Sequence, residues 1–371
     1  MKVALVHDHL AQDGGAERVV RVFQRMFPGA PLFTLVYRPD RAHPDFRGTD
    51  IRTSFLQRWP LATRLYQWYL PLMPTAVERF DLRGYDLVLS SSASFAKGVI
   101  TDPATLHACY LHSPTRYLWN DTVSYVNELR YARLLRSIAP LYLNRIRMWD
   151  RLAADRVDDF IVNSRLVQQR LWKYYHRQGT IIHPPVNVER FTLSDRPGTY
   201  YLAGGRLVSY KRFDLAVEAF NHLRLPLKIY GDGPAEPQLR AMAKPNIEFL
   251  GRVPDRQLQE LYRGAIAFIN PQQEDFGITM VEAMAVGRPV IAYASGGALE
   301  TVKPNITGAL FQDHDWEALA DTVIRFKPEQ YQPRTIRAWA ETFGVDRFIQ
   351  QLRTHLDRTY AAYQQRLHSL S

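Results

Sequence analysis

Cysteine is almost missing from this sequence. Cys109 is the single cysteine among 371 residues, so an intramolecular disulfide and a multi-cysteine metal site are both excluded. A chain with one thiol fits a reducing compartment. Cys109 lies in an apolar stretch, where its simplest role is packing in a core.

Long apolar runs are also absent. No stretch of 18 uncharged apolar residues occurs in the chain, so we expect no transmembrane helix. The apolar residues before His7 and Asp8 are too few for a signal peptide, and we expect none. These absences predict a cytoplasmic protein.

The composition that remains is ordinary for a globular protein. Hydrophobic residues make up 46% and charged residues 23%, which argues against a disordered chain. A domain usually holds about 100–200 residues, so the length predicts two domains or three.

Positive charge is concentrated in the first half of the chain. Residues 1–180 carry 25 basic and 16 acidic side chains, a net charge of +9, whereas residues 181–371 carry 22 and 21, a net charge of +1. Such an excess predicts an acidic partner for the first half: a nucleic acid, an anionic membrane surface or a phosphate-bearing substrate.

Strands alternate with helices along residues 1–180, as in a parallel α/β sheet. An apolar run at residues 2–7 is followed by Gly14-Gly15 and by helical spacing over residues 16–27. Ser164 is placed to cap a later helix. Further buried strands are expected at residues 32–37, 85–90, 107–112 and 159–163.

The same alternation restarts beyond Pro184-Pro185. Strands are expected at residues 200–203, 227–230, 246–250, 265–270 and 289–293, and a helix at 214–223. We therefore predict two doubly wound α/β domains, 1–180 and 181–345, with a C-terminal helix at 346–371 that packs back on the first. Ligands of such sheets bind at the carboxyl ends of strands, which places the site in a cleft between the domains.

Glycine loops follow several of the predicted strands. Gly204-Gly205-Arg206 closes one strand and Lys211 follows five residues later, an arrangement that can bind an anion through backbone N–H groups and two cations. The alternative is a glycine turn with solvated basic side chains. The loop around Asp232, Gly-Asp-Gly, and the pair Gly14-Gly15 are either turns or surfaces against which a phosphate or sugar lies.

Two carboxylates in residues 271–301 carry the sharpest signal. Glu274 lies in a loop after a strand, and Glu282 falls on the second turn of the next helix. That helix is rich in Met, Ala and Val, so a charged Glu282 needs a partner. We interpret both carboxylates as facing one ligand; the alternative is a capping or ion-pair role.

Three histidines have competing explanations. His7 and His9 flank Asp8 and could suggest a metal site, but no third ligand is evident. His112, considered alone, would more often be structural.

These motifs together resemble the retaining family-four glycosyltransferases of the GT-B fold. The resemblance covers the chain from about residue 1 to the C-terminal helix. It is carried by the E-x7-E spacing of Glu274 and Glu282, by G-G-R…K, by G-D-G, by PVIAYASGGALETV, by residues 14–17 and by residues 110–114. The segments HDHLAQDGGAERV and YLHSPTRYLW most resemble bacterial mannosyltransferases that build O-antigen and exopolysaccharide repeat units.

The resemblance implies a role for each motif residue. The N-terminal domain would bind the acceptor and the C-terminal domain the nucleotide sugar. Arg206 and Lys211 would hold the donor diphosphate, and Glu282 would bind the ribose. Glu274, with backbone N–H groups near Phe276, Gly277 and Ile278, would bind the transferred sugar, which His112 would face from the N-terminal domain. Donor-binding residues would also include Gly14, Gly15, Gly205 and Asp232.

Transfer onto a lipid-linked or polysaccharide precursor is the function we predict from this resemblance. The donor is expected to be GDP-mannose, with retention of configuration, no metal and no cofactor beyond the nucleotide sugar. Two alternatives stay open. One is an enzyme that uses UDP-glucose or another UDP-sugar, and the other is a non-catalytic nucleotide-sugar-binding scaffold.

Arginines alternate with aromatic side chains at residues 52–79 and 130–151. This composition is typical of a surface that contacts a membrane, and it predicts peripheral attachment at the inner face of the cell membrane. The alternative is ordinary helix packing with a solvated basic face. Nucleic-acid binding is a third interpretation that the sugar-nucleotide motifs do not favour.

Overall fold

A computed structural model describes residues 1–371 except 62–65, 121, 123–132, 197 and 371. The chain divides into two compact units. Unit 1 comprises Met1–His183 and Ile349–Ser371, and unit 2 comprises Pro184–Phe348.

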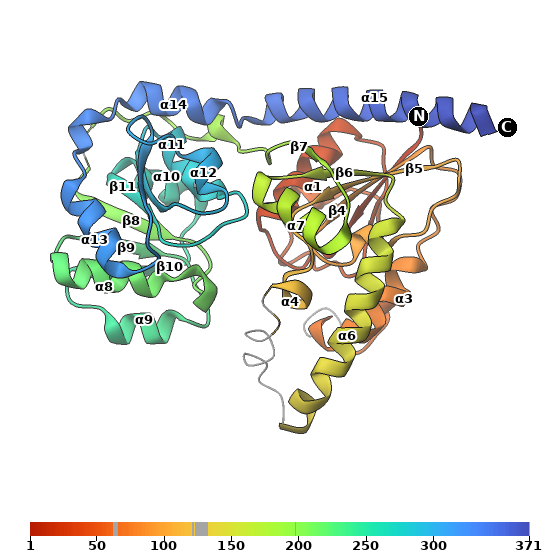
Figure 1. The fold of residues 1–371 in the computed structure, drawn as a ribbon, viewed down its shortest axis with the longest axis horizontal. Coiled ribbons are helices and arrows are strands. Elements are labelled where there is room, and N and C mark those ends of the chain that lie inside the picture. The colour runs from red at the N-terminus through yellow and green to blue at the C-terminus, as the bar shows by residue number, and fades with distance from the viewer. Residues whose placement is uncertain (62–65, 121, 123–132, 197, 371) are drawn as a thin grey trace. The chain divides into compact units, whose positions relative to one another are not determined.

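Unit 1 is built on a parallel sheet of seven strands in the order β3-β2-β1-β4-β5-β6-β7 (Figure 1). The chain winds outward from β1 in one direction and from β4 in the other, so the switch point lies between these two strands. The strands are β1 Val3–His7, β2 Leu32–Thr34, β3 Ile51–Thr53, β4 Leu87–Ser92, β5 Leu106–Leu111, β6 Asp159–Val162 and β7 Thr180–Ile181.

The helices that follow β1 and β6 pack against this sheet. In the helix that follows β1, the buried side chains Val19, Val22, Phe23 and Met26 recur at helical spacing. The described helices are α1 Gly15–Met26, α3 Met73–Glu78, α4 Arg116–Trp119, α6 Arg133–Asp155, α7 Arg165–Tyr175 and α15 Val345–Leu370. Ser164 caps α7 by accepting from the Val167 N–H at 3.2 Å.

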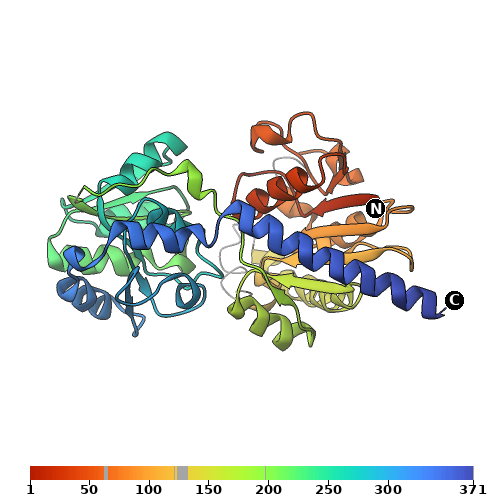
Figure 2. The same cartoon turned by 90° about the horizontal axis from the view of Figure 1, so that it is seen from above.

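The C-terminal helix α15 packs on unit 1 from Ile349 onward (Figure 2). Its buried side chains Phe348, Leu352 and Leu356 recur every four residues, as an apolar stripe requires. His355 Nε2 lies 2.7 Å from Asp159 Oδ2, and the Tyr363 hydroxyl donates to the Pro103 carbonyl at 2.7 Å. These contacts fix the helix to β6 and to the loop before β5.

Unit 2 is a six-stranded parallel sheet in the order β10-β9-β8-β11-β12-β13, with its switch point between β8 and β11. Its strands are β8 Tyr200–Gly204, β9 Leu227–Tyr230, β10 Ile247–Gly251, β11 Ala265–Asn270, β12 Val290–Tyr293 and β13 Gly308–Phe311. Its helices are α8 Phe213–Leu223, α9 Glu236–Met242, α10 Asp255–Arg263, α11 Ile278–Ala285, α12 Ala298–Thr301, α13 Trp316–Arg325 and α14 Pro333–Glu341.

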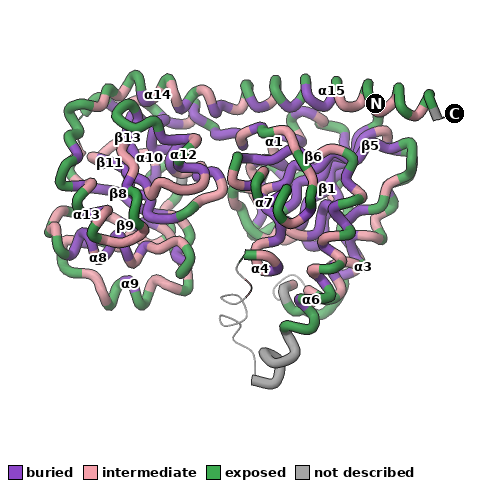
Figure 3. The backbone as a smooth tube through the Cα atoms, in the orientation of Figure 1, coloured by how far each residue is buried: buried purple, intermediate pink, exposed green. Residues whose placement is uncertain are grey.

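Helix α11 is buried along most of its length, from Met280 to Ala285 (Figure 3). It packs on β11 and β12 and against α14. A helix that is apolar on every side belongs in a core, so the one carboxylate it carries, Glu282, is held at a fixed place beneath the sheet edge.

Two strand predictions need correction. The strand predicted over residues 32–37 ends at Thr34, because the next residues pair with the loop after β1: Leu35 N donates to the Asp8 carbonyl at 3.2 Å, and Leu10 N donates to the Val36 carbonyl at 2.8 Å. The strand predicted at residues 85–90 is β4, Leu87–Ser92, and its three serines lie fully buried inside it.

Within the described part of the chain, no helix is both long and apolar enough to cross a bilayer.

Candidate functional site

The predicted site residues gather at the two switch points, where ligands of doubly wound sheets bind. In unit 2, Gly205 and Arg206 follow β8 and Glu274 follows β11. In unit 1, Asp8 follows β1, and His112 follows β5 next to β4. Each unit therefore presents one cluster at the carboxyl edge of its sheet.

The two glycine loops of unit 2 pack backbone against backbone. Gly205 has φ +131° and Gly231 has φ +107°, conformations that favour glycine. A Cβ at Gly231 would lie 1.8 Å from the Gly205 carbonyl oxygen, and Leu207 N donates to the Asp232 carbonyl at 2.8 Å. The G-D-G motif is thus explained by packing, and the Asp232 side chain is exposed.

Lys211 and Glu274 meet above the first glycine loop. Lys211 Nζ donates to Glu274 Oε1 at 2.8 Å, and Gln272 Nε2 donates to the same oxygen at 2.8 Å. Both members of the pair are partly accessible, 15% and 19% exposed. The Arg206 side chain is exposed beside the same loop. An ammonium and a carboxylate are therefore held together where an anionic ligand can reach them.

Glu282 has the partner that its burial requires. It is 3% exposed, and the Tyr262 hydroxyl donates to its Oε2 at 3.2 Å. Burial raises the pKa of Tyr262, and the neighbouring hydroxyl of Tyr230 and the charge of Glu282 add to the effect. Tyr262 therefore stays protonated and acts as a donor. Sequence reasoning missed this partner of Glu282, since α10 carries no motif.

The loop between Glu274 and α11 is shaped by two glycines. Gly277 has φ +90° and starts the helix. A Cβ at Gly297 would lie 2.2 Å from the Phe276 carbonyl oxygen, so the Ser-Gly-Gly segment after β12 fits closely against this loop. Phe276 is buried, with its ring centroid 5.5 Å from that of Phe343. The N-terminus of α11, at Ile278, is thereby held at the carboxyl edge of the sheet.

In unit 1 the cluster at the switch point is a row of polar groups, all buried except His112, which is half-buried. The β1–β4 register pairs His7 with Ser91. His7 Nδ1 lies 3.1 Å from the Ser91 carbonyl oxygen and 3.2 Å from Ser91 Oγ. Ser91 Oγ lies 2.8 Å from His112 Nε2. At the other end, His7 Nε2 lies 3.8 Å from Glu17 Oε1. We call these four residues the buried histidine chain.

Glu17 was not singled out by the sequence beyond its place in the family motif. Its Oε2 accepts from Gly14 N at 2.9 Å, which supplies the glutamate half of a capping box at the start of α1, where the N-cap is a glycine. Burial opposes charge on the His7–Glu17 pair, but the electrostatic attraction between the two side chains, whose nearest atoms lie 3.8 Å apart, outweighs it. The pKa of His7 is raised and that of Glu17 is lowered.

The pair therefore stabilises the fold within one pH window. Its contribution is lost as the pH rises through the raised pKa of His7, where the imidazolium is deprotonated. It is also lost as the pH falls through the lowered pKa of Glu17, where the carboxylate is protonated.

The side chains of Asp8 and His9 form hydrogen bonds to other protein groups. Asp8 accepts four backbone N–H groups from residues 93–96, at 2.6 to 2.9 Å. His9 Nε2 lies 3.1 Å from the Tyr66 hydroxyl. Among the described residues, no group of three or more His, Cys, Asp or Glu is arranged to hold a metal ion. Asp8 is thus a structural cap for the loop after β4.

A cavity of about 170 Å³ opens beside this cluster. Its wall is mostly apolar, with polar groups of Asp8, His9, Ser94, Tyr66 and Tyr117 added. The remaining lining residues are Leu35, Val36, Leu70, Met73 and Phe95. Ligand sites usually combine such an apolar wall with a few placed polar groups.

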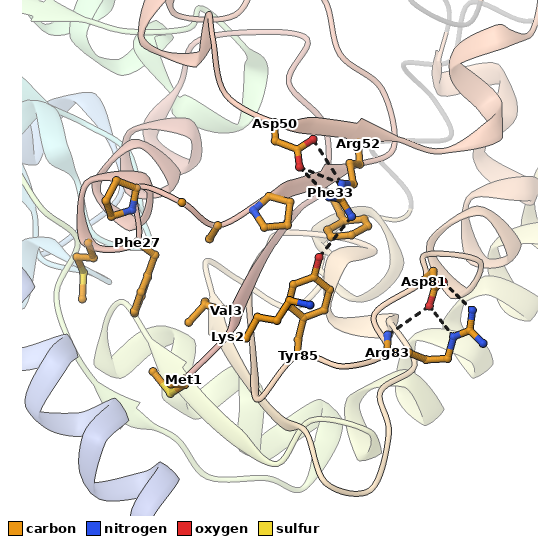
Figure 4. Close-up of a pocket in the computed structure, with 15 residues that line it drawn as sticks. Met1, Lys2, Val3, Phe27, Phe33, Asp50, Arg52, Asp81, Arg83 and Tyr85 are labelled. Atoms are coloured by element: carbon orange, nitrogen blue, oxygen red, sulfur yellow. Dashed lines mark hydrogen bonds and ion pairs between the residues drawn. The ribbon is translucent and has the colours of Figure 1, made fainter.

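A larger hollow of about 830 Å³ lies at the opposite, amino-terminal end of the strands (Figure 4). Four of its charged groups form two ion pairs, Arg52 with Asp50 at 2.8 Å and Arg83 with Asp81 at 2.7 Å. No predicted site residue lines it. Cys109 is fully buried in β5, and burial raises the pKa of its thiol to about 12.

Two residues of the YLHSPTRYLW motif donate hydrogen bonds to a buried ion pair, which sequence reasoning missed. Lys97 Nζ donates to Asp150 Oδ1 at 2.5 Å, and both side chains are at most 1% exposed. Asp150 also accepts from the hydroxyl of Thr115 at 2.7 Å and the indole of Trp119 at 2.8 Å. The segment after His112 is thereby fastened to α6.

Comparison with solved structures decides the architecture. The chain aligns with HepE of Anabaena in complex with UDP and glucose at TM-score 0.71 and 18% identity, over 96% of this chain and 99% of that one. It aligns with sucrose-phosphate synthase of Thermosynechococcus elongatus at TM-score 0.73 and 18% identity, over 98% and 100%. The chain has the GT-B fold. The predicted fold class is confirmed.

The match to a family model lies within unit 2. Residues 186–341 match the family model described as "Glycosyl transferases group 1". D-inositol 3-phosphate glycosyltransferase of Mycobacterium sp. (strain KMS) is 28% identical over 203 residues, 47% of this chain and 46% of the relative. Mannosylfructose-phosphate synthase of Agrobacterium fabrum is 33% identical over 164 residues, 38% and 36% respectively.

The matched stretch thus spans less than half the length of these curated relatives. The matches support a group 1 glycosyltransferase relationship for the unit that carries Lys211, Glu274 and Glu282.

Proposed function

We propose that this protein is a retaining glycosyltransferase that moves a hexose from a nucleotide sugar onto a glycan precursor. The observation that carries the proposal is the Lys211–Glu274 pair, 2.8 Å apart, above the glycine loop at the unit 2 switch point. The unit that holds this pair is the one that matches the glycosyl transferase group 1 model.

The reaction depends more on stabilising the negative charge of the departing diphosphate than on a protein nucleophile. The bond from the anomeric carbon to the donor phosphate breaks, and a bond from that carbon to the acceptor oxygen forms on the same face. The acceptor proton passes to a phosphate oxygen of the departing nucleoside diphosphate. Arg206 and Lys211 stabilise the negative charge that develops on the diphosphate, so the mechanism requires no metal.

The donor we propose is GDP-mannose, with UDP-glucose or another UDP-sugar as the second candidate. The relationship to an enzyme named mannosylfructose-phosphate synthase favours a mannosyl donor. The fold shared with HepE, whose structure holds UDP and glucose, favours the second candidate. A scaffold without activity is the third, and the Lys211–Glu274 pair argues against it. We place the acceptor at the 170 Å³ cavity of unit 1, where His9 and two tyrosines can bind hydroxyl groups.

A donor screen tests this function directly. The protein is mixed with GDP-mannose, UDP-glucose, UDP-GlcNAc or ADP-glucose, and thermal shift and sugar release are recorded with and without EDTA. We expect GDP-mannose to stabilise the protein and to be hydrolysed slowly, at the same rate in EDTA. Stabilisation without turnover would favour the scaffold, and loss in EDTA that Mn²⁺ or Mg²⁺ restores would reveal a metal.

The two carboxylates of unit 2 should separate in their effects. Glu282→Ala should chiefly weaken affinity for the nucleoside diphosphate, since Glu282 is proposed to bind the ribose. Glu274→Gln should chiefly lower turnover, because Glu274 is proposed to contact the transferred sugar. Calorimetry with the free diphosphate and initial rates with the donor distinguish the two. Equal losses of diphosphate affinity would contradict this division.

Membrane attachment remains a prediction that rests on the described part of α6. Arg64 and Arg130 lie outside the described residues, as do the side chains of Arg133 and Arg136. Along α6, Leu141, Met148 and Leu152 are exposed by 69%, 56% and 63% at helical spacing. Exposed apolar side chains with neighbouring arginines suit an anionic bilayer.

We therefore expect the protein to sediment with anionic liposomes at low salt and less at high salt, because salt screens exposed charges. The triple variant Leu141→Gln/Met148→Gln/Leu152→Gln should lose the fraction of liposome binding that persists at high salt. Leu299→Gln/Ile324→Gln, which removes equally exposed apolar groups of unit 2, is the control. If the wild type fails to sediment, a water-soluble acceptor becomes the better proposal.

A further inference from the structure

The hydrogen-bond partners in the buried histidine chain determine where its protons lie. A carbonyl oxygen can only accept, so His7 Nδ1, 3.1 Å from the Ser91 carbonyl, carries a proton. His7 Nε2 faces the Glu17 carboxylate at 3.8 Å, where a lone pair would be repelled and a proton attracted. His7 is therefore an imidazolium paired with an ionised Glu17.

The proton of Ser91 then has one direction left. Ser91 Oγ receives the Nδ1–H of His7 at 3.2 Å, and it lies 2.8 Å from His112 Nε2. A serine hydroxyl can accept two hydrogen bonds, but its own proton still needs an acceptor. Of the two ring nitrogens near Ser91 Oγ, only His112 Nε2 can accept it once His7 Nδ1 is protonated. A neutral imidazole with an acceptor at Nε2 has its proton at Nδ1, the nitrogen that is left for a ligand.

We propose that Glu17, His7 and Ser91 are positioning residues that hold His112 as a neutral imidazole with its proton on Nδ1. His112 then offers a donor, not an acceptor, to an oxygen of the transferred sugar. This proposal rests on the proposed function, which places His112 beside that sugar. It goes beyond that function by assigning a tautomer to His112 and a purpose to three residues behind it.

The charges around the buried histidine chain support a neutral His112. Burial and the charge of His7 lower the pKa of His112 to about 4, although Asp8 and Glu17 oppose the shift. Around His7 the charged or titratable groups are Glu17, Asp8 and His9, and His9 has a pKa lowered by burial. In the buried histidine chain, His112 is therefore neutral and His7 is charged at every pH from above about 4 up to the raised pKa of His7.

Strand β4 supplies a matched control. Ser90 Oγ lies 2.8 Å from His107 Nε2, and both side chains are fully buried. Ser90 is the neighbour of Ser91, and its side chain points to the other face of the sheet. Burial also lowers the pKa of His107 to about 4. Ser90→Ala thus removes an equivalent serine–histidine hydrogen bond that does not belong to the buried histidine chain.

The first test needs no substrate. The full-length protein is labelled with ¹⁵N-histidine, and two-bond ¹H–¹⁵N spectra are recorded across the pH range. His7→Gln and His112→Gln assign the two signals. We expect His112 with a protonated Nδ1 and an unprotonated Nε2, and His7 still mostly charged at pH 6.5, because its pKa is raised above that ordinary value. In Glu17→Gln, His7 should titrate at lower pH.

The second test measures transfer. Ser91→Ala should lower kcat/KM about 10- to 100-fold, the effect typical when the outer partner of a metal-bound histidine is removed. It should also mix the His112 tautomers. Ser90→Ala should leave both unchanged, and melting curves should show whether the two variants are equally stable.

The outcomes separate this proposal from the proposed function. A wild-type His112 protonated at Nε2, or a Ser91→Ala enzyme with wild-type tautomer and rate, overturns the proposal while leaving the glycosyltransferase intact. Absence of turnover with every donor overturns the function, and the spectra still decide the tautomer. If Ser91→Ala does not fold, the wild-type and Glu17→Gln spectra decide.

Discussion

Lys211→Ala should lower kcat with the nucleotide-sugar donor by about 100-fold or more. Removing one group that stabilises developing negative charge costs on the order of 2–4 kcal/mol in the barrier. The structure adds a second cost, because the variant leaves Glu274 with Gln272 but without its ammonium partner. Arg206→Ala should cause a similar loss. Initial rates at saturating donor measure both effects.

Lys228→Ala is the control for these variants. Lys228 forms an ion pair with Glu248 at 3.1 Å on the outside of unit 2, so its removal deletes an ion pair without touching the site. We expect its turnover to match that of the wild type. Rates near wild type for both Arg206→Ala and Lys211→Ala would refute the role given to the pair.

Local patterns predicted the central strands because these strands are apolar and bounded by glycine or polar residues. Strands β9 and β11 begin and end where the sequence analysis placed them. The short edge strands β3 and β13 were not predicted. Strand β3 pairs on one side only and exposes Arg52 and Thr53, so it shows no apolar run. Strand β13 is apolar but only four residues long and begins with Gly308, so it gives a weak local signal.

The serines of β4 show why composition alone misplaced the end of a strand. A run of three serines suggests a loop, yet Ser90, Ser91 and Ser92 are fully buried in the ladder. Two of the three hydroxyls are satisfied by groups distant in sequence: His107 is 17 residues away from Ser90, and His112 is 21 residues away from Ser91. Tertiary partners of this kind leave no local signal.

The same limit applies to the site. Lys211 and Glu274 are each recognisable in a motif, but they are separated by 63 residues, and only the sheet order brings them to 2.8 Å. The sequence indicated that a buried Glu282 needs a partner. It did not indicate Tyr262, which reaches Glu282 from a different helix.

Asp150→Ala should be the most destabilising single change in unit 1. It removes the acceptor of Lys97, Thr115, Trp119 and Tyr175, all within 2.5 to 2.8 Å. Breaking a buried ion pair by deleting one partner typically costs about 3–5 kcal/mol, because the other charge stays buried without compensation. Urea denaturation, followed by circular dichroism and tryptophan fluorescence, measures the loss.

Asp155→Ala, on the same helix, is the control for Asp150→Ala. It shows how much stability is lost when a helical carboxylate is removed from an exposed ion pair. Asp155 pairs with Arg151 at 2.7 Å on the surface, where Asp155 is 52% exposed, and such pairs contribute about 0–1 kcal/mol. Because Asp150 fastens the segment after His112, Asp150→Ala should also lower transfer at temperatures where the variant is folded. Stability within about 1 kcal/mol of the wild type, the range expected for an exposed pair, would show that the network around Asp150 does not hold this segment in place.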